Sequence, residues 1–159
     1  MVYEYTNSFI YIFKRFFAMF DKILLPTDGS EFSEHEVERA TKALSDVGEI
    51  IILAVASKLE PTTPFQKRKN IENLNKGFLK EAHENVDHMA KRFDEDVNVK
   101  KMVVTGSPAE TIVQVAEDED VDLIIIAASG KSGLHRFFIG SVAEKVLKST
   151  ERDVLLIHN

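Results

Sequence analysis

Short apolar runs alternate with amphipathic segments from Lys22 to the end of the sequence. A short apolar run bounded by polar residues predicts a buried strand, whereas apolar residues spaced three or four apart predict a helix. The pattern gives five strands and four helices in strict alternation. Such units join parallel strands by right-handed crossovers and place helices on both faces of one sheet. We therefore predict an α/β fold with a five-stranded parallel sheet, an open twisted sandwich of the Rossmann-like kind.

The predicted strands are residues 23–25, 50–56, 97–104, 121–128 and 154–157. The longest predicted helix covers about residues 68–94, where seven apolar side chains recur at helical spacing. The other three helices begin with capping signals, namely Ser33 with Glu36, Ser107 with Pro108, and Ser141 with Glu144. The first and third pairs have the spacing of a capping box, and Pro108 suits the first helical position.

Composition narrows the class of protein. The chain has 159 residues, which suffices for one domain with a buried core. Its net charge of −6 argues against non-specific nucleic-acid binding, because that requires a basic face, but a small anion could still bind backbone N–H groups. The absence of cysteine excludes disulfides, thiolate chemistry and cysteine-based zinc sites. No apolar run reaches the roughly 18 residues that cross a bilayer. We therefore expect a cytoplasmic protein.

The first twenty residues differ from the rest, since they hold five of the eleven phenylalanines. They lack the basic start and small-residue cleavage site of a signal peptide. The segment could form an amphipathic helix on a membrane or on a partner. The simpler interpretation is that translation begins at Met19, which leads directly into the first strand. We accordingly divide the chain into an aromatic leader, residues 1–20, and a folded domain, residues 21–159.

Ligands of such sheets bind beyond the carboxyl ends of the strands, where the strand order reverses. The loop after residue 128 carries Gly130, Gly133 and Gly140, the last at the start of a helix. Glycine lets a backbone approach phosphate closely, and a helix N-terminus favours an anion. The alternative is that these glycines only serve turns. Asp28, after the first strand, could accept a hydrogen bond from a base or ribose, hold a metal, or form a common Asp-Gly turn.

Other kinds of site are not supported by the spacing. The Gly-Lys-Ser at 130–132 is not a P-loop. A P-loop needs another glycine five residues before the glycine of Gly-Lys-Ser, and that position here is Ile125. His83 and His88 are five residues apart, so they do not share a helix face as metal ligands would. A Ser–His–Asp hydrolase would need a Gly-x-Ser-x-Gly elbow, which the sequence lacks. We therefore assign no catalytic residue and no metal site.

Taken together, these features resemble the universal stress protein family over about residues 21–159. The resemblance lies in motifs that occur in the family's order: residues 22–30 (KILLPTDGS), 104–109 (VTGSPA), 140–147 (GSVAEKVL) and 153–157 (DVLLI). It implies an adenine-nucleotide-binding fold and a homodimer that pairs the last strand, Val154 to His158, with its twin. Such pairing would bury an apolar sheet edge that otherwise risks aggregation.

ATP-binding members of the family carry Gly, two residues, Gly, nine residues, and then Gly-Ser or Gly-Thr. Gly130, Gly140 and Ser141 fit this spacing, whereas Ala127 replaces the first glycine. Alanine is harmless there if its backbone φ is negative and costly if φ is positive. Members that lack the motif do not bind ATP. Ala127 thus keeps open the alternative of a nucleotide-free dimeric module for interaction or signalling.

The resemblance implies ATP, or AMP or ADP, as the ligand, with Mg²⁺ as an accompanying ion. The implied binding residues are Pro26, Thr27, Asp28, Val55, Ile126, Ala127, Gly130, Lys131, Gly140, Ser141 and Val142. Asp28 and the backbone of Val55 would meet the adenine, Ile126 and Ala127 would flank the base and ribose, and the residues from Gly130 onward would surround the phosphates. The implied function is that of a regulatory ATP-binding stress-response protein. No catalytic base is evident, and slow hydrolysis stays open.

Overall fold

The computed structural model describes residues 20–30, 33–61, 68–128 and 139–157. The aromatic leader up to Met19 and the loop residues Gly130 and Lys131 therefore lie outside the described residues. The described elements alternate as predicted, and in chain order they are β1 (Phe20–Pro26), α2 (Ser33–Ala43), β2 (Leu44–Ala56), α3 (Arg68–Ala90), β3 (Asn98–Thr105), α4 (Pro108–Asp118), β4 (Leu123–Ala127), α5 (Ser141–Ser149) and β5 (Asp153–Ile157). Within these residues no helix is long and apolar enough to span a membrane.

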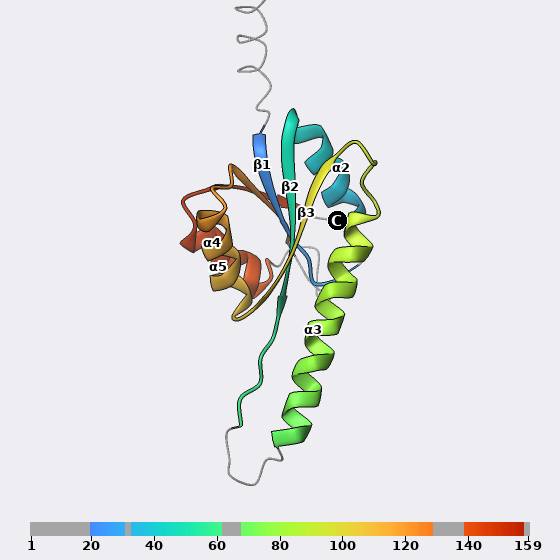
Figure 1. Cartoon of the computed structure of the whole chain (residues 1–159). Helices are drawn as coiled ribbons and strands as arrows, with labels where there is room; N and C mark the ends of the chain where they lie inside the picture. The colour runs from blue at the N-terminus through green and yellow to red at the C-terminus, as the bar shows by residue number, and fades with distance from the viewer. Residues whose placement is uncertain (1–19, 31–32, 62–67, 129–138, 158–159) are drawn as a thin grey trace, which may run out of the picture.

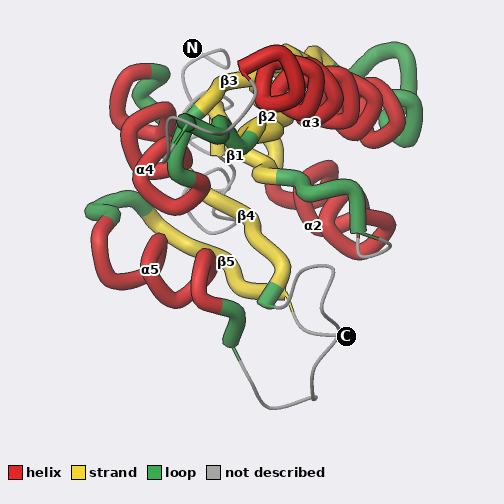
Figure 2. Tube along the Cα trace, turned by 90° about the horizontal axis from the view of Figure 1, so that it is seen from below, coloured by secondary structure: helices red, strands yellow, loops and turns green. Residues whose placement is uncertain are grey.

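The five strands form one sheet in the order β3-β2-β1-β4-β5, and all neighbouring strands are parallel. Helices α2 and α3 cover one face of the sheet, and α4 and α5 cover the other (Figures 1 and 2). The predicted α/β fold is confirmed. The strand order reverses at β1, because the chain builds β2 and β3 on one side of it and β4 and β5 on the other. The switch point therefore lies between β1 and β4.

Helices on both faces explain why the central strands are continuous apolar runs. Residues 50–53 of β2 are all fully buried. Side chains alternate between the two faces, so that Ile23 and Leu25 pack beneath α2 and α3, whereas Leu24 packs beneath α4 and α5. The two cores share the sheet as their common wall and hold the carboxyl ends of β1 and β4 in fixed positions.

The helix starts agree only in part with the predicted capping signals. Ser107 is the N-cap of α4, and Pro108 follows at the start of the helix as predicted. The capping box at α5 is wrong, because Gly140 is the N-cap and Ser141 is already the first helical residue. The carboxylate of Glu144 instead pairs with Lys148 one turn later, at 2.5 Å. The N-terminus of α5 thus has no side-chain cap within the part of the chain that the structure describes.

Strand β2 is longer than predicted, since it begins at Leu44, directly after α2. Leu44 pairs with Phe20, and the register then shifts before Lys22 pairs with Glu49. This first part of β2 contains polar residues and the exposed Val47, so neither a continuous apolar run nor an alternation marks it in the sequence. The added length extends the end of the sheet opposite the carboxyl ends of the strands.

Candidate functional site

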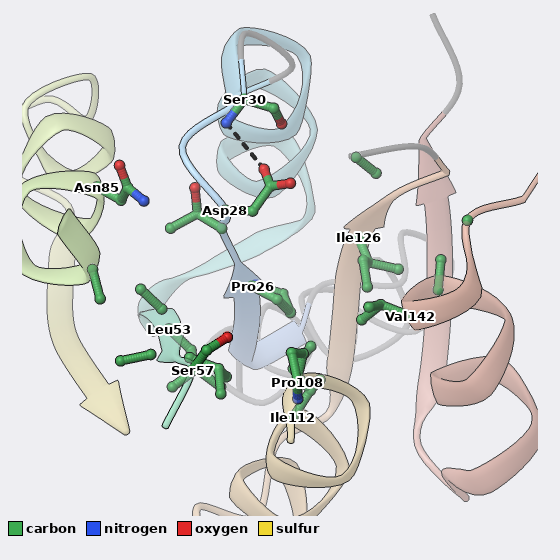
Figure 3. Close-up of a pocket in the computed structure, with 18 of the residues that line it drawn as sticks. Pro26, Asp28, Ser30, Leu53, Ser57, Asn85, Pro108, Ile112, Ile126 and Val142 are labelled. Carbon is green, nitrogen blue, oxygen red and sulfur yellow. Dashed lines mark hydrogen bonds between the residues drawn. The ribbon is translucent and has the colours of Figure 1, made fainter. Parts of the chain in front are cut away.

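A cavity of about 580 Å³ lies at the carboxyl ends of β1, β2 and β4 (Figure 3). Its walls also include the start of α5, the start of α4 and one side of α3. The structure brings together every predicted site residue that it describes: Pro26, Thr27, Asp28, Val55, Ile126, Ala127, Gly140, Ser141 and Val142 line this cavity. The cavity therefore lies at the switch point of the sheet, where ligands of parallel sheets bind.

The cavity opens because β1 and β4 separate before they end. Their pairing covers only Ile23 with Leu123 and Leu24 with Ile124. On its other side β1 remains paired with β2 up to Pro26, and the N–H of Thr27 still donates to the carbonyl oxygen of Leu53 at 2.8 Å. Beyond Leu24 the two strands therefore bound a crevice, and Figure 3 shows Pro26 and Ile126 on either side of it.

The loop after β1 holds Asp28 at the cavity. One carboxylate oxygen of Asp28 accepts a hydrogen bond from the N–H of Ser30 at 3.0 Å, shown as the dashed line in Figure 3. Gly29 between them has a φ of +76°, which favours glycine, and a Cβ there would collide with the side chain of Asn85 on α3. The Asp-Gly pair is thus a turn, as one alternative held, and this turn places the carboxylate of Asp28 in the lining.

The N-terminus of α5 forms the opposite wall. The N–H of Gly140 is already engaged, since it donates to the carbonyl oxygen of Ala128 at 2.6 Å, and the carbonyl of Gly140 accepts from Glu144 at 2.9 Å. The next backbone N–H groups, those of Ser141 and Val142, belong to the first turn, where the helix itself offers no acceptor. These two amides, rather than that of Gly140, are therefore the ones suited to an anion.

The sequence analysis missed two ionisable lining residues, Glu36 and Glu81. Of these two, Glu36 is the buried one. It was interpreted as the acid of a capping box, but its side chain is 4% exposed and lines the cavity. Burial raises the pKa of the Glu36 carboxyl to about 8; a hydrogen bond from the backbone N–H of Ala127 opposes this rise, and the negative charge of Asp28 adds to it. A usable signal existed, because Glu36 lies four residues before the fully buried Ala40 and so shares its helix face.

Comparison with known proteins identifies the family. The universal stress protein family model matches residues 19–158. The chain belongs to the universal stress protein family. It is 35% identical over 157 residues to Universal stress protein MJ0577 of Methanocaldococcus jannaschii, a match that covers 88% of this chain and 96% of the relative. The solved structure of MJ0577 superposes with a TM-score of 0.75 at 32% identity, covering 87% and 96% of the two chains.

Two further solved structures carry nucleotides. A universal stress protein family protein from Arabidopsis thaliana with AMP bound matches with a TM-score of 0.60 at 16% identity, covering 86% of this chain and 90% of its own. A universal stress protein in complex with cAMP matches with a TM-score of 0.56 at 22% identity, covering 87% and 97%. At these identities the likeness shows the shared fold, and the nucleotides are properties of those two proteins.

The departure of this universal stress protein from the family's glycine pattern causes no backbone strain. Among the described residues other than glycine, Asp120 is the one with a positive φ. Ala127 therefore has a negative φ, and the concern that alanine would force a strained backbone at this position does not apply. Ala127 forms part of the cavity wall.

Proposed function

We propose that this universal stress protein binds an adenine nucleotide in the cavity and acts in regulation. The observation that carries the proposal is that the nine predicted site residues within the described part of the chain all line one cavity at the switch point. The nucleotide-bound family members support it at the level of the fold. A cysteine-free chain is consistent with a cytoplasmic location, which we include in the proposal.

In this proposal the adenine lies toward Asp28 and the backbone of Val55, and the phosphates lie toward the N-terminus of α5. The two ends of the cavity differ in a way that suits this orientation. Leu53, Ala54 and Ile112 supply apolar surface for a base, whereas Ser141 and Val142 supply backbone N–H groups at the positive end of a helix dipole. Gly130 and Lys131 would complete the phosphate end, with Mg²⁺ accompanying a triphosphate.

The test is to denature the purified protein and to identify released nucleotide by mass, followed by titration with ATP and GTP. We expect an adenine nucleotide, or preferential binding of ATP when the protein is purified empty. Asp28→Ala should reduce the preference for ATP over GTP, because the side chain proposed to recognise the base is removed. If no nucleotide is released and neither ATP nor GTP binds, the chain is instead a nucleotide-free interaction or signalling module.

We also propose a homodimer through β5. This strand is the outer edge of the sheet, and Leu155 at its centre remains 39% exposed in the single chain. An apolar edge strand is stabilised when it pairs with another strand. We expect sedimentation to give twice the monomer mass, and Leu155→Lys to give the monomer mass. Leu147→Lys on α5 is the matched control, because Leu147 is also 39% exposed but lies on a helix. Dissociation by both variants would contradict pairing through β5.

A further inference from the structure

We propose that Glu36 determines the specificity of the cavity: a phosphate-bearing ligand is accepted while the Glu36 carboxyl carries a proton and is bound more weakly once that proton is lost. The proposal rests on the proposed function, since it concerns how this cavity receives an anionic nucleotide. The family resemblance assigned no role to Glu36. Its place in the structure, buried in the lining of the cavity, requires a separate explanation.

The backbone of β4 explains why a carboxyl lies at this point. The N–H of Ala128 donates to the carbonyl oxygen of Ile157 on β5 at 2.8 Å. Successive residues of a strand direct their backbone polar groups to opposite sides, so the N–H of Ala127 is directed toward β1. Because β1 and β4 no longer pair at this level, the Ala127 N–H lacks a strand acceptor, and the carboxyl of Glu36 accepts its hydrogen bond instead. Glu36 therefore lies within the crevice between the strands.

The other charged groups at the cavity make an ionised Glu36 unfavourable for an anion. Asp28 contributes a carboxyl from the loop after β1, and Glu81 contributes one from α3. The described lining residues of β1, β2, β4, α4 and α5 are all uncharged. Lys131 and Arg136 lie in the segment outside the described residues. Ionisation of Glu36 would thus add a third negative charge to the described lining, in a buried position where water screens it poorly.

The direction of the pH effect follows from linkage. With a pKa of about 8, Glu36 is mostly neutral at pH 7 and mostly ionised at pH 9.5. An anionic ligand that prefers the neutral carboxyl raises this pKa further, so binding at high pH takes up a proton from solution. Affinity should be level below about pH 8 and should fall by up to about tenfold for each pH unit above it. Without ligand, Glu36 should also make the free energy of unfolding decrease when pH rises from about 5 to 8. In this range the folded state binds more protons than the unfolded state, because the pKa of Glu36 is higher in the folded state.

The experiment is calorimetric titration with ADP and with adenosine at pH 7 and pH 9.5, on the wild-type protein and on Glu36→Gln. We expect wild-type affinity for ADP to fall about tenfold or more between the two pH values, with uptake of one proton per ADP at the higher pH. Glu36→Gln keeps the hydrogen-bond acceptor for Ala127 but cannot ionise, so its affinity for ADP should change far less. Adenosine carries no phosphate, and its affinity should be nearly the same at both pH values in both proteins.

Glu84→Gln is the control for the loss of a negative charge as such, because Glu84 is 64% exposed on α3 and does not line the cavity. It should retain the wild-type dependence on pH.

Binding of ADP with the same pH dependence in wild type and Glu36→Gln would overturn the role of Glu36 and leave the proposed function standing. Failure of both proteins to bind ADP and adenosine at either pH would overturn both. Melting curves from pH 5 to 8 give a readout without ligand, and parallel curves for wild type and Glu36→Gln would also overturn the proposal.

Discussion

Replacement of Ile51 by alanine is expected to lower the free energy of unfolding by about 2–5 kcal/mol, because it leaves a cavity in the centre of the sheet. Ile51 is fully buried on β2 and packs in the cluster formed with α4 and α5. A loss of this size is a large part of the stability of a typical domain. At about 2–4 °C for each kcal/mol in a domain of this size, the melting temperature should fall by roughly 10 °C.

Val47→Ala is the matched control, since Val47 lies on the same strand but its side chain is 84% exposed. A substitution at such a surface position should change the free energy of unfolding by no more than about 0.5 kcal/mol. Urea denaturation of the two variants and the wild type measures the difference directly. Equal losses from Ile51→Ala and Val47→Ala would contradict the position of Ile51 between the sheet and its helices.

The pattern of the sequence was sufficient for the fold wherever burial on both faces leaves a clear mark. Residues 50–53 and 123–126 are continuous apolar runs, and both are buried in the centre of the sheet. The first part of β2 could not be predicted in the same way, because Asp46 and Val47 are exposed and carry no periodic pattern. Its strand conformation follows from pairing with Phe20, a contact between segments distant in the sequence.

In the candidate site, too, residues at the ends of strands were predicted, whereas some residues on helices were not. Asp28 could be placed from sequence, since it follows a predicted strand and the carboxyl ends of parallel strands meet at one edge of the sheet. Val55 and Ala127 were implied by the family resemblance, and all three line the cavity. Asn85 could not be placed in this way, because it lies on a helix and reaches the cavity through the packing of that helix on the sheet. Glu36 was not placed there, although its spacing from Ala40 puts it on the buried face of α2. The spacing of Glu36 from Ser33 equals that of a capping box, and this local pattern favoured a capping role for Glu36 over a place in the site.

Replacement of Ser141 by proline should weaken the binding of ATP by about tenfold to a hundredfold and leave the fold intact. Proline lacks a backbone N–H, so the variant removes one of the two amides that we assign to the phosphates. A hydrogen bond to a charged group contributes about 1.5–3 kcal/mol, which corresponds to this loss of affinity. The helix should tolerate the change, because proline is favoured at the first helical position, and Pro108 already occupies that place in α4.

The residue before the substitution also permits it. Proline favours an extended conformation in the residue that precedes it, and Gly140 already has a φ of −63° and a ψ of 152°. Ser141→Ala is the control, since it removes the hydroxyl but retains the N–H, and it should lose less affinity than the proline variant. Adenosine tests the base end of the cavity alone, because it has no phosphate. It should bind both variants with the same affinity as it binds the wild type. If Ser141→Pro melts like the wild type yet binds ATP equally well, the N-terminus of α5 does not hold the phosphates, and the nucleotide must be oriented differently.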